Sequence, residues 1–380
     1  MEIEKLNNSL DIKSALKNLG VDSGGVNILS QKAKTHIIHI KNLHVGAANI
    51  LKQDALSIGA DLAVPRGTVL ALTPEVDCIL IATTAQLKTL SKKELAQPFG
   101  LKNLAIKLDS IINTDKPSEV SIMGVINANQ DSFFSGSRFL SSDAIDEILK
   151  MIDDGADIID VGAVSSAPNS KSVSANEELE RIKPILELIY EQKLYDKVKF
   201  SIDSYEPLVI KEALSSGFSM VNDITGLQND EVAKLCAEYD ASVVIMHMQG
   251  TPQTMQDNPR YENILSDVYS FFETRIQKAE SFGISDIIVD IGIGFGKTLD
   301  DNLVLIKNLE HFLTLGKPLL VGASRKSMID KISSSLPDER LAGTIALHLE
   351  SIRNGASMLR VHDVKEHVHA MKVYRALKSI

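Results

Sequence analysis

The chain has 380 residues, of which 44% are hydrophobic and 24% are charged, and its formal net charge is −10. This composition is ordinary for a globular protein and excludes a mostly disordered chain. The acidic balance and the absence of Trp argue against nucleic-acid binding, and no apolar run reaches the length of a membrane span. A polar N-terminus without a signal-peptide pattern and two distant cysteines, Cys78 and Cys236, predict a cytoplasmic protein.

A polar segment that contains proline, 111–120, separates two blocks of different pattern. We expect a small α/β N-terminal domain over 1–115 and a second domain over 116–380. In the first block, short apolar runs predict strands and longer patterned segments predict helices. The predicted strands are 34–40, 60–65 and 76–82, and the predicted helices are 49–59 and 84–97. His36 and His39 share one apolar run, and we expect them to be half-buried strand residues, with a metal site as the alternative.

The second block repeats one pattern eight times: a short apolar run that ends in a polar or glycine cluster. The runs are 121–126, 157–162, 198–203, 218–223, 242–247, 286–291, 318–323 and 357–362. Near-continuous Val, Ile, Leu and Met are typical of strands buried on both faces. Helical patterns such as 177–192 and 207–217 lie between them. Eight such units in about 260 residues predict a TIM (β/α)8 barrel, with a doubly wound open sheet as the alternative.

Polar residues end most of the predicted strands, where a TIM barrel builds its active site. They are Asn127, Asp203, Asn222, Asp223, His247, Asp290, Arg360, His362 and Asp363, with Ser324, Arg325, Lys326 and Ser327 after the seventh strand. Any one of them could be a cap or a local hydrogen-bonding group, but their number indicates a site. We expect Asp223 to be a helix N-cap, and Asp363 to be either a loop contact or a site residue.

These strand ends have two chemical characters. The carboxyl and amide groups of Asp203, Asn222 and Asp290 suit the donor and acceptor edge of a heterocycle. The cationic or potentially cationic residues suit a phosphate or pyrophosphate. These are Lys297, Arg325, Lys326, Arg360 and His362. Asn127 offers a neutral oxygen for Mg²⁺ held mainly by substrate phosphate. The predicted ligand therefore has a heterocyclic end and an anionic end.

Several familiar motifs are absent or incomplete. The glycine-rich segment 292–298 has one residue too few for a P-loop, and we interpret it as a loop whose glycines let the backbone approach a ligand, with a tight turn as the alternative. No zinc or nucleophile motif is present. His367 and His369 are spaced to bind a metal, but we expect them on an exposed final helix.

The ordered motifs from 121 to about 375 resemble those of the dihydropteroate synthase family. They are IMGVINANQDSF, GADIIDVG, SIDS, VNDITG, VIMHMQGTP, VDIGIGFGKT, VGASRKS and RVHDV. The resemblance implies a TIM barrel that joins 6-hydroxymethyl-7,8-dihydropterin pyrophosphate to p-aminobenzoate in folate biosynthesis. It also implies Mg²⁺ as cofactor, inhibition by sulfonamides and a homodimer.

The resemblance also implies roles for individual residues. The pterin-binding residues are Asp203, Asn222, Met246, Asp290, Phe295 and Lys326. Pyrophosphate is bound by Asn127, Arg360 and His362, with Mg²⁺ at Asn127. The p-aminobenzoate-binding residues are Phe133, Ser166, Pro168 and Ser327. The catalytic set is Asp131, Lys326, Arg360 and His362, and Asp131 also helps to form the aminobenzoate pocket.

The chain departs from the family pattern in two loops and at one strand end. The Thr-Pro pair of the first loop is missing from 127–133, and the second loop has Val164 and Ala167 where the family has Glu and Arg. Ile291 replaces the usual Pro. A pterin-binding methyltransferase module and a non-catalytic pterin-binding protein are therefore kept as alternatives. The first block resembles an extension found on some family members, for which we expect a structural or assembly role rather than a second active site.

Overall fold

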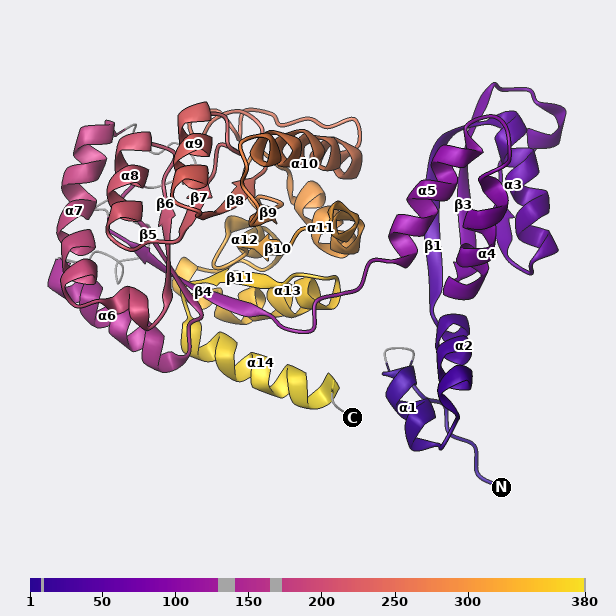
Figure 1. Cartoon of the computed structure of the whole chain (residues 1–380), viewed down its shortest axis with the longest axis horizontal. Helices are drawn as coiled ribbons and strands as arrows, with labels where there is room; N and C mark the ends of the chain where they lie inside the picture. The colour runs from indigo at the N-terminus through magenta and orange to yellow at the C-terminus, as the bar shows by residue number, and fades with distance from the viewer. Residues whose placement is uncertain (8–9, 129–140, 165–172, 379–380) are drawn as a thin grey trace. The chain divides into compact units, whose positions relative to one another are not determined.

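The computed structural model describes residues 1–7, 10–128, 141–164 and 173–378. The chain divides into two compact units (Figure 1). The first comprises Met1–Asp115 together with Arg375–Ile380, and the second comprises Lys116–Tyr374.

The N-terminal unit is a three-stranded antiparallel sheet in the order β1-β3-β2, with helices against it (Figure 1). Its elements are α1 (Ile12–Asn18), α2 (Ser23–Ala33), β1 (Thr35–His44), α3 (Val45–Ser57), β2 (Asp61–Ala63), η1 (Thr68–Leu70), β3 (Glu75–Thr83), α4 (Thr84–Glu94) and α5 (Leu101–Ile112). Buried and exposed residues alternate along β3, as expected for a sheet with one covered face. The predicted small α/β fold is confirmed.

The two histidines of β1 differ in their surroundings. His36 is half-buried and its Nε2 lies 2.8 Å from Thr84 Oγ1, as expected for a strand residue. His39 is exposed, with Nε2 3.7 Å from Asp77 Oδ2, so the expectation of a half-buried side chain is wrong for His39. The two residues differ because His39 points to the uncovered face of the sheet.

The second unit is a closed barrel of eight parallel strands in the order β10-β11-β4-β5-β6-β7-β8-β9. The strands are β4 (Ser121–Asn127), β5 (Ile158–Gly162), β6 (Lys199–Asp203), β7 (Met220–Asp223), β8 (Ser242–Met246), β9 (Ile287–Asp290), β10 (Leu319–Val321) and β11 (Met358–Val361). The last strand pairs with the first, Met358 opposite Ser121, so the sheet has no edge. The predicted TIM barrel is confirmed, and the open-sheet alternative is wrong.

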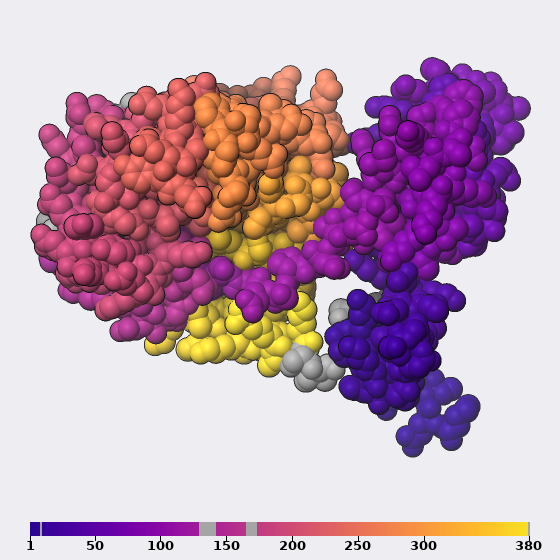
Figure 2. Space-filling model, viewed as in Figure 1, coloured from indigo at the N-terminus to yellow at the C-terminus, as the bar shows by residue number. Residues whose placement is uncertain are grey.

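Helices surround the strands, and on the face seen in Figure 2 their atoms close over the barrel. They are α6 (Ser141–Asp154), α7 (Ala175–Glu191), α8 (Pro207–Ser215), α9 (Asp230–Glu238), α10 (Ile264–Ser281), α11 (Leu299–Lys307), α12 (Ser327–Ile332), α13 (Leu341–Arg353) and α14 (Val364–Lys378), with short 3-10 turns η3 (Leu194–Asp196), η4 (Leu309–Leu315) and η5 (Pro337–Glu339). In α7 the apolar residues buried against the strands are Ile182, Ile185, Leu186 and Ile189. None of the helices in the described ranges is long and apolar enough to cross a membrane.

Inside the barrel, one large apolar side chain from most strands fills the axis. The set is Met123, Ile158, Met220, Val244, Ile288, Leu320 and Met358. These apolar side chains fill the barrel interior, and the polar side chains lie at the carboxyl ends of the strands.

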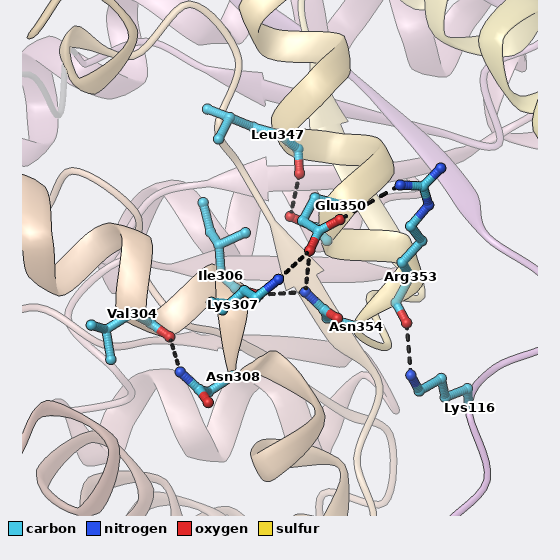
Figure 3. Close-up of polar contacts among 10 residues, drawn as sticks. Lys116, Val304, Ile306, Lys307, Asn308, Leu347, Glu350, Arg353 and Asn354 are labelled. Carbon is cyan, nitrogen blue, oxygen red and sulfur yellow. Dashed lines mark hydrogen bonds and ion pairs between the residues drawn. The ribbon is translucent and has the colours of Figure 1, made fainter. Parts of the chain in front are cut away.

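Polar contacts join the start of the barrel to its last helices (Figure 3). Lys116 Nζ donates to the Arg353 carbonyl at 2.8 Å and pairs with Glu310 at 2.8 Å. Asn354, just after α13, donates through Nδ2 to the Ile306 carbonyl of α11 at 3.0 Å. These bonds satisfy carbonyls at the helix ends and fix the chain where it enters β4.

Candidate active site

Arg360 of β11 lies between two carboxylates at the carboxyl end of the barrel. Its Nε donates to Asp160 Oδ2 at 2.6 Å, and its Nη2 donates to Asp203 Oδ2 at 2.5 Å. Asn222 on β7 donates through Nδ2 to the same Asp160 oxygen at 3.0 Å. Side chains from four strands, β5, β6, β7 and β11, are thus joined in one network, which we call the rim network.

The charges of the rim are closely balanced. Burial raises the pKa of Asp203 to about 6, although Arg360 opposes that shift. Burial also lowers the pKa of Lys326 to about 8, which Arg360 reinforces and Asp290 and Asp203 oppose. The pKa of Arg360 is raised by Asp160 and Asp203 against the effect of burial, so Arg360 stays charged. Groups tuned in this way are typical of functional sites.

Asp290, at the end of β9, is the third buried carboxylate of this region, with 6% of its surface exposed. Burial raises its pKa, and the Gly292 amide, which donates to Oδ1 at 2.8 Å, opposes the shift. Asp203 and Asn222 are paired residues on the adjacent parallel strands β6 and β7, so their side chains point to the same side of the sheet. These carboxyl and amide groups present both acceptors and donors to a planar ligand.

An apolar wall accompanies the polar groups. Met246 at the end of β8 packs with Phe295, Met255 and Ile224. Lys326 Nζ lies 4.3 Å from the centroid of the Phe295 ring, a cation–π contact. The structure therefore brings Met246, Phe295 and Lys326, which were predicted to share the pterin site, close to one another.

Two loops, which follow β10 and β11, complete the described part of the site. We call residues 322–326 the β10 loop and residues 362–363 the β11 loop. Ser324 Oγ lies 2.9 Å from His362 Nδ1, and Arg325 donates two hydrogen bonds to the Asp363 carboxylate, one of them 3.0 Å from Nε to Oδ2. Asp363 is thus a loop contact. Ser327 follows the β10 loop as the first residue of α12.

His362 is neutral in this environment. Burial lowers its pKa to about 3, and Arg360 and Arg325 lower it further. Its contribution to an anion site is therefore a hydrogen bond rather than a positive charge. Of the cationic or potentially cationic residues, His362 is therefore expected to act in its neutral form, because it is buried and lies beside Arg360 and Arg325.

Lys297 does not belong to the anion site, contrary to expectation. It is 2% exposed, and its Nζ donates to the carbonyls of His247, Gly292 and Phe295 at 2.8–3.1 Å. Burial lowers its pKa to about 7, and all three bonds require the ammonium form. Lys297 therefore holds the loop after β9 to the end of β8.

The glycines of that loop serve close packing within the protein. A Cβ at Gly292, where φ is +65°, would lie 2.0 Å from the His247 carbonyl oxygen, and a Cβ at Gly296 would lie 2.6 Å from that of Gln249. The tight-turn alternative therefore describes these two positions. The His247 ring is buried edge-on against Phe271, with centroids 4.9 Å apart, so it is a packing residue rather than a rim ligand.

Asp223 also has a structural role, but not the predicted one. Its carboxylate accepts bonds from the backbone amides of Thr225 and Leu227 and from the Thr225 hydroxyl. It therefore stabilises the turn after β7, whereas Asn229 caps the next helix, α9. The expectation of an N-cap is wrong because six residues separate Asp223 from the start of that helix at Asp230.

Four predicted site residues lie outside the described residues: Asp131, Phe133, Ser166 and Pro168. Ala167 also lies outside them, whereas Val164 is half-buried just after β5. Asn127 is the half-buried last residue of β4. In the described part of the chain no three His, Cys, Asp or Glu side chains gather to hold a metal. A single amide oxygen at Asn127 still fits Mg²⁺ that is bound chiefly through phosphate and water.

Asp160 is the main site residue that sequence reasoning missed. It lies in the middle of β5, is fully buried, and anchors both Arg360 and Asn222. A signal was available, because a carboxylate inside a strand that is buried on both faces requires a partner. Asp160 was not predicted because it lies inside its strand and not at the strand's end.

Comparison with known proteins shows the family of the chain. Residues 123–362 match the family described as "Pterin binding enzyme". The bifunctional dihydropteroate synthase/dihydropteroate reductase of Helicobacter pylori is 42% identical over all of both chains. The dihydropteroate synthase of Escherichia coli is 40% identical over 69% of this chain and 93% of its own. The Yersinia pestis dihydropteroate synthase, solved with a sulfonamide drug, has a TM-score of 0.66 and 35% identity over 69% of this chain and 96% of its own.

Proposed function

The chain belongs to the dihydropteroate synthase family of pterin-binding enzymes, and from this premise we propose how its rim residues divide the reaction between them. The chain is a transferase that condenses 6-hydroxymethyl-7,8-dihydropterin pyrophosphate with p-aminobenzoate, giving 7,8-dihydropteroate and pyrophosphate. The observation that carries the proposed roles is Arg360 bridging Asp160 and Asp203 at the carboxyl end of the barrel.

The rim network binds the pterin. The carboxylates of Asp203 and Asp290 accept the ring N–H donors, and Asn222 reads an adjacent donor and acceptor pair. Met246 and Phe295 cover the flat face of the ring, and Lys326 reaches it from the side of Phe295. Support comes from the convergence of these side chains.

The other end of the site stabilises the leaving group. Arg360, His362 and Asn127 bind the pyrophosphate, and Mg²⁺ at Asn127 supplies further positive charge when bound. When the pterin donors engage Asp203, the Arg360 guanidinium shares that carboxylate with them and becomes available to the pyrophosphate. The network thus couples pterin binding to the charge that the leaving group needs.

The chemistry then requires no protein nucleophile. The bond from the pterin CH₂ to oxygen breaks, and its electron pair leaves with pyrophosphate. The aniline nitrogen of p-aminobenzoate attacks the CH₂ and then loses a proton. Ser327 receives the aminobenzoate carboxylate, and Asp131, Phe133, Ser166 and Pro168 complete its pocket. The enzyme's contributions are alignment of the nitrogen and electrostatic stabilisation of the separating charges.

The test is pyrophosphate release by the purified full chain with dihydropterin pyrophosphate and Mg²⁺, with and without p-aminobenzoate. We expect release that depends on aminobenzoate and is lost in Asp203→Ala and Arg360→Ala. Arg353→Ala is the matched control, because Arg353 is an exposed arginine of the same unit whose side chain pairs, among the described residues, with Glu350 alone. Tight pterin binding without turnover would favour a non-catalytic pterin-binding protein, and binding of methyltetrahydrofolate instead would favour a methyltransferase module.

Sulfonamides are expected to compete with p-aminobenzoate in this chain. Ala167 removes a cation from the second loop relative to the family pattern, so competition is expected to be weak. Ala167→Arg should lower the sulfonamide inhibition constant and the KM for aminobenzoate together. An inhibition constant that stays the same in this variant would contradict a role for position 167 in that pocket.

A second activity is suggested by the Helicobacter pylori relative, whose match includes residues 1–115. A dihydropteroate reductase would add a hydride and a proton across a C=N bond of the product, with the hydride from a reduced nicotinamide or flavin. The test is tetrahydropteroate formation by the full chain with each donor. If no tetrahydropteroate forms, the structural or assembly role that we expected for the N-terminal unit is favoured. Light scattering of the full chain would then measure whether it forms the predicted homodimer.

A further inference from the structure

Two buried histidines connect the β10 loop to the β11 loop. His348 on α13 is 1% exposed and His367 on α14 is 2% exposed. The Ala323 amide donates to His348 Nε2 at 3.1 Å, His348 Nδ1 lies 2.9 Å from His367 Nε2, and His367 Nδ1 lies 2.6 Å from the Asp363 carbonyl oxygen. The expectation that His367 is exposed is therefore wrong, because it shares the buried face of α14 with Val364 and Met371.

The two ends of this chain of hydrogen bonds fix its protonation. A backbone amide can only donate, so His348 Nε2 carries no proton and Nδ1 carries one. His348 Nδ1 then donates to His367 Nε2, and His367 Nδ1 donates to the Asp363 carbonyl, which can only accept. Both rings are neutral in the Nδ1–H form, and a proton on either Nε2 would place two donors against each other.

Helix α13 holds the β10 loop at three points along one face. Arg340, which precedes the helix, donates through Nη1 to the Arg325 carbonyl at 3.1 Å. Thr344 Oγ1 accepts from the Arg325 amide at 3.0 Å, and His348 accepts from the Ala323 amide. Spacings of four and eight residues place these side chains on one face of the helix. Of the three, His348 is the one whose bond continues to the β11 loop.

The loops that are joined carry groups of the substrate site. The β10 loop ends in Lys326, over Phe295, and the β11 loop begins with His362, which bonds Ser324. A displacement of one loop relative to the other would separate the lysine assigned to the pterin from the histidine assigned to the pyrophosphate.

We propose that His348 and His367 are positioning residues: as one hydrogen-bonded pair they hold the β10 loop against the β11 loop, and so set the place of Lys326 relative to His362. What the two loops bind rests on the proposed function. The hydrogen-bonded pair itself is tested independently of it.

Burial keeps both histidines of the pair neutral. Burial lowers the pKa of His348 well below its usual range, and His367 and His362 lower it further. Burial also lowers the pKa of His367, with Asp363 and Glu366 opposing. The arrangement is therefore expected to persist across neutral pH.

The first experiment is a long-range ¹H–¹⁵N spectrum of the histidine rings in the full chain, with assignments from His348→Gln and His367→Phe. We expect both rings as Nδ1–H with an unprotonated Nε2 at pH 7. An Nε2–H form in either ring would overturn the proposal, whether or not the chain is active as a synthase.

The second experiment compares the KM and kcat of variants. His348→Leu leaves the Ala323 amide and His367 Nε2 unpaired, and should raise the KM for dihydropterin pyrophosphate about 10–100-fold with a smaller change in kcat. His348→Gln keeps an acceptor for Ala323 and should recover much of the loss. Ser351→Ala is the control, because Ser351 is buried on the same helix and, among the described residues, its hydroxyl bonds only to the Leu347 carbonyl of that helix.

Equal KM values for His348→Leu and Ser351→Ala would overturn the proposal. If His348→Leu does not fold, His367→Phe, which keeps an aromatic ring but no ring nitrogen, is measured in its place. If the wild-type chain binds dihydropterin pyrophosphate without turnover, the same comparison is made with dissociation constants, so failure of the synthase function and failure of the pair are distinguished.

Discussion

At the rim of the barrel, Arg360 lies between the carboxylates of Asp160, which is buried, and Asp203, which is half-buried, whereas in the N-terminal unit Glu94 is buried without such a partner. Within the described residues, neither oxygen of Glu94 has a hydrogen-bond partner. Burial raises the pKa of Glu94 to about 7, and the neighbouring Asp54 raises it further. At Asp203 the arginine thus opposes the rise in pKa that burial causes, whereas at Glu94 the neighbouring Asp54 adds to that rise.

The difference shows when a buried acid indicates a binding site. An unpaired buried carboxylate lowers stability, and a buried carboxylate held by an arginine is costly to disturb. Asp203 has that arginine and also lies beside Asn222 at the end of the adjacent strand. Burial alone, as at Glu94, indicates no ligand.

The largest expected effect is that of Arg360→Met, which leaves the carboxylates of Asp160 and Asp203 without their cation. An uncompensated buried charge costs about 3–5 kcal/mol of stability. Synthase activity should fall about 10³-fold, since the leaving group also loses its cation. Denaturant unfolding and pyrophosphate release measure the two effects. Adding Asp160→Asn and Asp203→Asn should restore stability but not activity, and recovery of activity would contradict the role given to Arg360.

The next effects concern two lysines, the buried Lys297 and the half-buried Lys326. Lys297→Met leaves three carbonyls without a donor and should lower the free energy of unfolding by about 2–4 kcal/mol. Lys326→Met should instead weaken pterin binding about 10–100-fold with little change in stability, since its contact is with the ligand site and the Phe295 ring. Urea unfolding measures the stability of both variants, and pterin titration measures their affinity for the ligand. Equal loss of pterin affinity in the two variants would show that Lys297 reaches the ligand.

A pH profile tests the charge of Asp203. Its folded-state pKa of about 6 exceeds the usual 3.8, so the folded chain holds the extra proton between these values, and the free energy of unfolding falls as pH rises through that window. Pterin binding has the opposite trend, because it needs the carboxylate. We expect kcat/KM to fall about tenfold per pH unit below 6. In Asp203→Asn, kcat/KM should no longer fall at acidic pH. If the same fall persists in the variant, a group other than Asp203 causes it.

The smallest effect is expected in the N-terminal unit. Because the pKa of Glu94 is raised to about 7, the penalty for its ionisation is complete above that pH and absent below about 4.5. Glu94→Gln should therefore raise the free energy of unfolding by about 1–2 kcal/mol at pH 8, with no gain at acidic pH. Synthase activity should be unchanged. A loss of stability at pH 8 would mean that the carboxylate has a partner that the amide cannot replace.

The sequence predicted the barrel well, because strands that are buried on both faces give an unmistakable apolar run. The residues at strand ends, such as Asp203, Asn222 and Asp290, could be placed at one rim for the same reason, since parallel strands end together. Their ligand roles remain predictions.

Other features depend on contacts that no local pattern encodes. Lys297 was predicted to bind an anion, but its ammonium group donates to three backbone carbonyls that come together only in the folded chain. Burial within the folded barrel lowers the pKa of His362 to about 3, and Arg360 and Arg325 lower it further. The pairing of His348 with His367 joins two helices whose registers are fixed only by packing in the barrel wall.

The most direct measurement of the central claim is single-turnover pyrophosphate release by the wild-type chain and by Asp203→Asn, with saturating p-aminobenzoate. We expect a burst of pyrophosphate and an equal amount of 7,8-dihydropteroate from the wild type, and little of either from the variant at pH 7. Equal bursts from both proteins, or pyrophosphate without dihydropteroate, would contradict the claim that the rim network binds the pterin for this condensation.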